Sequence, residues 1–317
     1  MTLYDAYMID RRLKVLQAIA RHGTVTAAAE VCRITPSAVS HQMQALAREL
    51  DVVLLEPIGR TVRLTDAAYT LLEHGATLAA QWERARADLA AHQDREELTG
   101  NLRICGFSTA AAVVAPRALA RLREQHPGLR VQLREVEPAR AFDLLAAGDT
   151  DIAVVVATPS IPPRTDAAFE QRPLYLEPLD LLVGPEHPLA DRTSVSLLEV
   201  ATDPWILGTP GRAYHQLVTL ACTGAGFDPA VAHFVDEWDT GAALVARGFG
   251  VALVPRLADL PAHHDTRRIP VSGVPVPTRH VVTAVRAGAA GQPAIAAGLA
   301  ALREVRRSEL PELTEIA

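Results

Sequence analysis

Short polar side chains that could bond to DNA lie close together near the start of the chain, where the sequence predicts a helix. The helix is expected from about residue 36 to residue 48, because the Thr35 hydroxyl can cap it and Pro36 suits a first helical position that needs no N–H. On a 3.6-residue period Val39, Met43 and Leu46 share one face, which we assign to the protein core. The other faces remain available for a partner.

The polar groups on these other faces are candidate DNA contacts. Serine can bond to a base or a phosphate, glutamine can bond to adenine through two hydrogen bonds, and a helix N-terminus attracts phosphate. Arginines on the hairpin that follows would bind phosphate or the minor groove. The alternative is that these side chains are simply solvated. The candidate DNA-binding residues are Thr35, Pro36, Ser37, Ser40, His41, Gln44, Arg60 and Arg63.

A second capped helix lies just before the first and predicts a helix-turn-helix. Thr24 can cap it, and the small residues 27–29 would let another helix approach closely. Two capped helices joined by about four residues are typical of this motif, whose second helix enters the major groove. Two β-prone runs, Val52–Leu55 and Thr61–Leu64, flank Gly59 and predict a hairpin, the wing. We therefore expect a winged helix-turn-helix domain, all-α apart from its wing, over residues 1–65.

A long helix is expected next, over residues 66–93, with its cap at Thr65 and Asp66. Its small and apolar positions recur at spacings of three and four residues, which favours pairing with a second helix. A symmetric dimer would also place two reading helices on two DNA half-sites. The alternative is an ordinary amphipathic helix packed on its own chain. The seam positions are Ala68, Leu71, Gly75, Leu78, Trp82, Ala85 and Leu89.

Strands alternate with helices after a polar break at residues 94–100, which we interpret as a hinge. A β-α-β-α-β order from residue 101 predicts a parallel sheet covered by helices. A second series follows, beginning with an expected strand Leu179–Val183. We expect an α/β effector-binding domain over residues 101–310. Subdomain I would comprise about 101–168 and 276–310, subdomain II about 169–275, with ligand space between them.

The candidate effector-binding residues follow the predicted strands, because ligands of open α/β sheets bind beyond the carboxyl ends of strands. They are Ser108, Thr109, Thr158, Gly208, Thr209 and Trp238. Phe107 and Phe249 lie nearby and are expected in the core. The nearest cations are Arg140 and Arg212, so we expect a small effector that is mostly apolar or carries a single charge.

The order of these motifs resembles that of the LysR-type transcriptional regulators, over nearly the whole chain. The resemblance is carried by stretches that include Ala38-Val39-Ser40, Leu64-Thr65, Asp151-Ile152-Ala153, His187-Pro188-Leu189 and the run from Gly248 to Pro255. It implies a sequence-specific DNA-binding regulator with a periplasmic-binding-protein-like effector domain. It also implies a homodimer or a homotetramer, with operator DNA as partner. As a mechanism, we expect the bound effector to change the spacing or angle of paired reading heads, and through it the recruitment of RNA polymerase.

The chain departs from the family pattern mainly in the DNA-reading domain. His41 stands where a stronger base is usual, Leu55 where phenylalanine is common, and Pro57 where arginine is frequent. Ala68 replaces a usual glycine. These changes concern individual contacts to DNA and leave the expected fold intact.

Composition agrees with this interpretation. The net charge of −6 argues against a protein that coats nucleic acid everywhere, whereas residues 1–65 carry eight basic and six acidic side chains and so are locally positive. Apolar runs of spanning length and a signal pattern are not found in the sequence, so we expect no membrane partner. Three cysteines, few and far apart, suit a reduced cytoplasmic protein.

Other classes of function have little support in the sequence. A phosphate loop, a zinc-hydrolase helix and a nucleophile elbow are not found, so we expect no enzyme and no catalytic residues. Thiol redox sensing is disfavoured because Cys105 and Cys222 are expected to be buried. His263-His264-Asp265 suggests metal, but it lies in a Pro-rich polar loop without another obvious ligand, so we expect no metal site. The only small molecule we expect is an organic effector.

Overall fold

The N-terminal domain is a helix-turn-helix with a short hairpin. The computed structural model describes residues 10–59, 61–92, 97–273 and 276–310. The elements of this domain, which we call the head, are α1 (Arg11–His22), α2 (Val25–Cys32), α3 (Pro36–Glu49), β1 (Leu55–Ile58) and β2 (Thr61–Leu64). The three helices enclose a small apolar core that includes Leu16, Ile19, Val39, Met43 and Leu46.

The predicted helix caps are confirmed. The hydroxyl of Thr24 accepts a bond from the backbone N–H of Ala27 at 3.1 Å, and that of Thr35 accepts one from Ala38 at 3.2 Å. Each bond satisfies an N–H that the first helical turn leaves unpaired, and such a cap contributes about 1 kcal/mol. The caps therefore fix where α2 and α3 begin, and with them the turn between the two helices.

The wing begins later than the sequence predicted. Its first strand runs from Leu55 to Ile58 and pairs antiparallel with β2, so the expected strand Val52–Leu55 is wrong except for its last residue. Asp51 adopts a left-handed conformation after α3, and the Val52 N–H bonds back to the Ala47 carbonyl at 3.0 Å. Residues 52–54 therefore form a connection, and Leu54 is buried in the head core.

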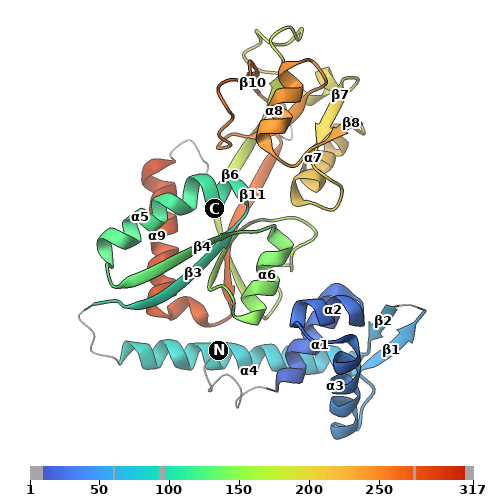
Figure 1. Ribbon diagram of the computed structural model, residues 1–317, viewed down its shortest axis with the longest axis vertical. Helices are drawn as coiled ribbons and strands as arrows, with labels where there is room; N and C mark the ends of the chain where they lie inside the picture. The colour runs from blue at the N-terminus through green and yellow to red at the C-terminus, as the bar shows by residue number, and fades with distance from the viewer. Residues whose placement is uncertain (1–9, 60, 93–96, 274–275, 311–317) are drawn as a thin grey trace.

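Helix α4 (Asp66–Ala91) leaves the head and runs beneath the C-terminal domain (Figure 1). The Thr65 hydroxyl caps it through the Ala68 N–H. Within the part of the chain that the structure describes, none of the helices is both long and apolar enough to cross a membrane.

The C-terminal domain is built on a mixed sheet with the strand order β10-β6-β11-β5-β3-β4, in which β9 also pairs with β6. Strand β3 is parallel to both β4 and β5, as the sequence predicted, whereas β11 is antiparallel to β5 and β6. The strands of this sheet are β3 (Gly100–Gly106), β4 (Leu129–Glu135), β5 (Ile152–Val156), β6 (Phe169–Val183), β9 (Ala252–Pro255), β10 (Arg267–Pro270) and β11 (Thr278–Arg286).

Two long strands join the halves of this domain. Strand β6 begins at Phe169, ten residues before the expected strand, and with β11 it extends from subdomain I into subdomain II (Figure 1). Its first stretch of sequence after Phe169 is polar and ends in a proline, Glu170-Gln171-Arg172-Pro173, so this part was not predicted as a strand. Subdomain II adds the parallel pair β7 (Pro204–Leu207) and β8 (Ala230–Phe234), with α7 (Ala213–Gly224) and α8 (Trp238–Ala246).

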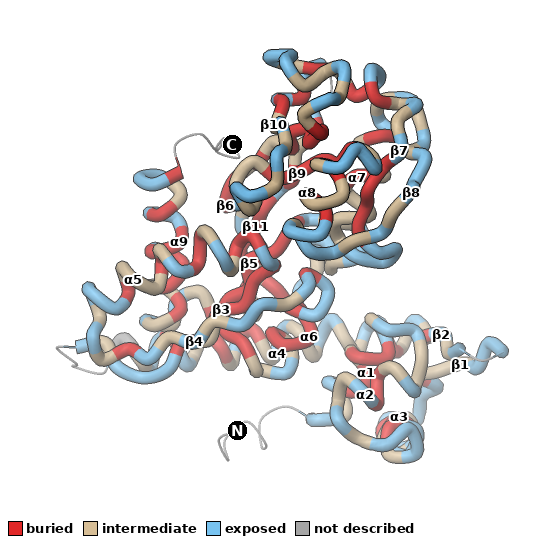
Figure 2. The backbone as a smooth tube through the Cα atoms, turned by 45° about the horizontal axis from the view of Figure 1, so that its top comes forward, coloured by how far each residue is buried: buried red, intermediate tan, exposed pale blue. Residues whose placement is uncertain are grey.

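Helices cover both faces of the sheet in subdomain I. Helices α5 (Ala115–Gln125) and α9 (Pro293–Glu309) pack on one face, and α6 (Pro138–Ala147) packs on the other, each over its own apolar cluster. The buried stretches run through the central strands (Figure 2). This doubly covered sheet gives α6 a rigid base, which matters because α6 also touches the head.

The head is docked on its own C-terminal domain. The guanidinium of Arg21 lies over the ring of Phe169 at 4.5 Å and donates to the Phe142 carbonyl at 3.2 Å. His22 bonds to the buried carboxylate of Asp143 at 2.9 Å. These contacts join the end of α1 to the middle of α6.

Helix α4 forms a second contact with subdomain I. The buried Glu83 accepts a bond from Arg286 at 2.7 Å and another from Gln292. The Ala80 carbonyl lies against Gly288, which has φ +83°. The residues that α4 turns towards subdomain I, Ala80, Glu83 and Ala87, are not positions of the predicted seam. The seam is instead partly used against the head, because Ala68 is buried in the head core, Leu71 packs on that core and Gly75 lies against Leu13. Leu78 and Leu89 remain exposed.

Candidate DNA-binding and effector-binding sites

The outer face of α3 presents the predicted DNA-binding side chains to solvent. Val39, Met43 and Leu46 are buried, as the helical period predicted. The Ser40 hydroxyl donates to the Pro36 carbonyl at 3.1 Å, and its lone pairs stay free to accept. Six of the predicted DNA-binding residues belong to α3 or its cap, and all six are exposed: Thr35, Pro36, Ser37, Ser40, His41 and Gln44.

The wing presents one of the two predicted arginines. Arg63 faces Glu56 across the hairpin and donates to its carboxylate at 2.6 and 3.2 Å, an interaction that raises the pKa of Arg63. A phosphate would therefore have to compete with Glu56 for this guanidinium. Arg60 lies outside the described residues.

In subdomain I, the predicted effector-binding residues lie at one edge of the sheet. Ser108 follows β3, and Thr158 follows β5. These two strands are neighbours and parallel, so their carboxyl ends lie at the same edge of the sheet. Ser108 is exposed, whereas Thr158 is half-buried and shares a hydrogen bond of 2.8 Å with Ser160. Thr109 is only 3% exposed, and its hydroxyl has no hydrogen-bond partner among the described residues. A π-helical turn, Ala110–Val114, follows it, a feature that is frequent at functional sites.

In subdomain II, Thr209 is held by the carboxylate of Asp236. Its N–H and its hydroxyl each donate to Asp236 at 2.9 Å, and the Arg212 guanidinium lies 3.2 Å from the same carboxylate. Desolvation acts to raise the pKa of Asp236, but the two bonds from Thr209 and the charge of Arg212 together lower it. Gly208 is buried beside Tyr214, where an added Cβ would come within 2.9 Å of the ring.

Arg212 also connects the two subdomains. It pairs with Glu137 of subdomain I at 3.0 Å, while its other contact is to Asp236 of subdomain II. Glu137 follows β4 and directly precedes α6. The strand ends of the two subdomains therefore face each other, as expected for a ligand site, and one cation sits between two carboxylates.

Trp238 borders a small apolar hollow inside subdomain II. Its ring meets that of Tyr214 edge to face at 4.9 Å, and its indole N–H is buried without a hydrogen-bond partner among the described residues. The hollow is lined by apolar side chains and, at its rim, by Asp236 and Glu237. The hollow has a volume of about 10 Å³, no more than one water molecule needs, so the side chains that line it nearly fill it.

A buried ion pair on the two long strands was not predicted from the sequence. Arg279 of β11 donates to Glu177 of β6 at 2.7 Å, and both are almost completely buried. Arg279 also lies over the Phe107 ring at 4.8 Å, immediately before Ser108. The sequence held one signal for this pair, because Glu177 and Arg279 are charged residues within strands that are otherwise mostly apolar. Phe107 is in the core as expected, but Phe249 is 51% exposed, so that assignment was wrong.

The cysteines are separated in the fold. Cys105 and Cys222 are buried in different apolar clusters, one in each subdomain, and Cys32 is half-buried in the head. Burial raises the pKa of Cys105 to about 11 and that of Cys222 to about 12. Both thiols are therefore protonated at neutral pH, which makes them poor nucleophiles.

A DNA-reading head joined to a two-part sensor domain defines a one-component transcriptional regulator. Residues 11–69 match the model of the bacterial regulatory helix-turn-helix protein, lysR family, and residues 95–307 match the LysR substrate binding domain. The chain therefore belongs to the LysR family of DNA-binding transcriptional regulators, whose members have an effector-binding domain and are not enzymes.

Curated relatives have varied roles. The hydrogen peroxide-inducible genes activator of Pectobacterium carotovorum subsp. carotovorum is 27% identical over 248 residues, which cover 78% of this chain and 80% of that protein. The dual regulator GltC of Bacillus subtilis is 27% identical over 246 residues, covering 77% and 80%. An identity of 27% does not identify the small molecule to which this chain responds.

Solved structures share the fold over almost the full length. A cysteine variant of full-length OxyR from Pseudomonas aeruginosa has a TM-score of 0.60 at 23% identity and covers 92% of this chain and 93% of its own. Full-length BenM has a TM-score of 0.59 at 22% identity, with 96% and 98% coverage.

Proposed function

We propose that a small organic effector binds between the subdomains, at the strand ends that carry Ser108, Thr109, Thr158, Gly208, Thr209 and Trp238. The observation that carries this proposal is the Arg212 bridge, because it links Glu137 and Asp236 across the space between the two rows of strand ends. An effector that entered there would alter this bridge and change the relative placement of the subdomains. It would control transcription only by its differential affinity for the two arrangements.

The polar groups at the site favour a neutral or singly charged effector. Arg212 is flanked by two carboxylates, and Arg279 is neutralised by Glu177. The Thr109 hydroxyl and the Trp238 N–H have no hydrogen-bond partner among the described residues and can bond to an oxygen of the ligand. These features support the candidate residues as a set.

On DNA, α3 would read bases through Ser37, Ser40, His41 and Gln44, with Thr35 and Pro36 near a phosphate and Arg60 and Arg63 on the wing. Two heads of a homodimer would read two half-sites of an operator, and a homotetramer would pair two such dimers. The exposed Leu78 and Leu89 of α4 are available for the second helix. We also propose that the regulator contacts RNA polymerase and acts in the cytoplasm.

A thermal-shift screen of neutral and monocarboxylate metabolites on the full chain tests the effector site. We expect compounds that raise the melting temperature of the wild type to lose most of that shift in Thr109→Val and in Thr209→Val. Glu73→Gln, an exposed change on α4, should keep the full shift. Equal shifts in all variants would place the effector elsewhere.

A further inference from the structure

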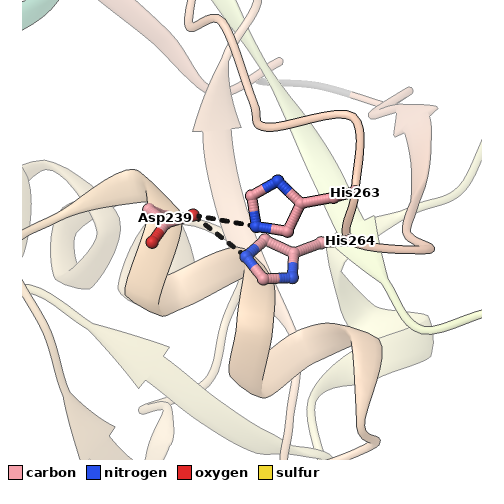
Figure 3. Close-up of side chains that lie close together, drawn as sticks. All are labelled: Asp239, His263 and His264. Atoms are coloured by element: carbon pink, nitrogen blue, oxygen red, sulfur yellow. Dashed lines mark hydrogen bonds and ion pairs between the residues drawn. The ribbon is translucent and has the colours of Figure 1, made fainter.

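Two neighbouring histidines and an aspartate from another element meet on the surface of subdomain II (Figure 3). The Nε2 atoms of His263 and His264 lie 3.6 and 3.0 Å from the same oxygen, Oδ1 of Asp239. The two imidazole rings are 4.0 Å apart between centroids. The sequence groups the histidine pair with Asp265 and offers no further ligand, whereas folding brings Asp239 to the pair from the first turn of α8.

We propose that Asp239, His263 and His264 bind a divalent transition-metal ion of borderline softness, such as Zn²⁺. Imidazole nitrogens and a carboxylate oxygen are a common ligand set for this class of ion. The ligand atoms all lie within 4.8 Å of one another. A tetrahedral site with metal–ligand bonds of about 2.1 Å needs separations of about 3.4 Å. Small rotations of the exposed His263 ring would therefore complete the geometry.

The packing around the cluster holds its two halves together. Leu260, from the loop that carries the histidines, lies in the same apolar cluster as Trp238, which precedes Asp239. Arg268 donates to the carbonyls of Arg256 and Ala258 at 2.7 Å each and so fixes the start of the loop. A ligand set held by packing requires less ordering when the ion binds.

The surrounding charges are compatible with a cation. Asp236 and Glu237 precede the cluster on the same stretch, and they offset the positive end of the α8 dipole. Arg267, the cation next to the histidine loop, is paired with Asp265. Three protein ligands leave at least one coordination position for water or for an oxygen of a bound molecule. The ion would tie the loop to α8 and so stabilise the side of the hollow that Trp238 borders.

Calorimetric titration of the tag-free full chain with Zn²⁺ alone tests this proposal. We expect one ion per chain, with affinity reduced by about tenfold or more in His263→Gln, His264→Gln and Asp239→Asn. His263 is 70% exposed, so its replacement cannot fail merely through misfolding. His74→Gln removes an exposed histidine of α4, and Asp259→Asn removes an exposed carboxylate before the histidine loop; both controls should bind as the wild type does.

Titration with Co²⁺ identifies the ligand type. A site of two imidazoles and a carboxylate gives visible cobalt bands without the near-ultraviolet thiolate band that a cysteine ligand would add. Absence of stoichiometric Zn²⁺ binding, a thiolate band, or equal affinity in the cluster variants and the two controls would each overturn the proposal.

Discussion

Ser40 and His41 of α3 offer a test of DNA reading by single residues, because both are exposed on the face opposite the head core. The double change Ser40→Ala, His41→Ala should weaken specific binding by about 1–3 kcal/mol, which is about fivefold to 150-fold, because base or phosphate contacts are lost while the core is untouched. The measurement is affinity for a fragment that the full chain selects from random-sequence DNA. Glu73→Gln serves as the control, and an unchanged affinity in the double variant would remove these residues from the reading face.

The cysteines allow a second test at this scale. Since the pKa values of Cys105 and Cys222 are raised to about 11 and about 12, their reactive thiolate forms are scarce at pH 7.5 and become abundant only as the pH approaches those values. We expect native protein at pH 7.5 to be alkylated first at Cys32, and hydrogen peroxide to leave DNA affinity unchanged.

Peptide mass mapping after brief alkylation measures the first effect, and unfolded protein is its control. A peroxide-dependent change in DNA affinity that disappears in Cys222→Ser would contradict the expectation. It would also bring the chain closer to its relatives that activate hydrogen peroxide-inducible genes.

At the scale of elements, the contact between α4 and subdomain I depends on a glycine. Gly288 has φ +83°, and an added Cβ would overlap the Ala80 carbonyl of α4, so Gly288→Ala should separate the two elements. Gly148→Ala is a matched control, because Gly148 has φ +76° but open space around it. Both variants share a backbone penalty of about 1–2 kcal/mol, and the additional loss in Gly288→Ala reports the contact. Thermal unfolding of the two variants measures this difference, and equal losses would show that α4 is held by other contacts.

The elements that the sequence predicted well are those with a local cause. The threonine caps and the buried face of α3 depend on residues a few positions apart, and both were confirmed. The first wing strand was misplaced because Val52 and Val53 are β-prone in isolation, whereas the backbone turn at Asp51 leads them into a connection.

Contacts that join distant segments could not be predicted in the same way. The Arg279–Glu177 pair brings together residues about a hundred positions apart, and the pairing follows from the antiparallel register of β6 and β11. The same is true of the Arg212 bridge and of Asp239 beside the histidines. The ends of the predicted strands indicated the candidate effector site. The ion pairs around it could not be predicted, because they form only when distant segments of the chain come together.

At the scale of the whole molecule, α6 connects the candidate effector site with the head. Glu137 precedes its first turn and holds Arg212 of subdomain II, while Asp143, further along the same helix, holds His22 of the head. The helix packs on the sheet through Ala141, Phe142 and Leu145. We expect α6 to transmit the effector's influence to the head.

A double-mutant cycle between Glu137→Gln and His22→Gln tests this transmission through DNA affinity. If α6 couples the two contacts, the double variant should depart from additivity by about 0.5–3 kcal/mol, whereas independent distant sites add to within about 0.5 kcal/mol. Pairing Glu137→Gln with Glu73→Gln supplies the independent case, because Glu73 is exposed on α4. Coupling in the first cycle alone would show that the head responds to the bridge between the subdomains. Additivity in both cycles would mean that the effector acts on the heads by another route, such as the contact of α4 with subdomain I.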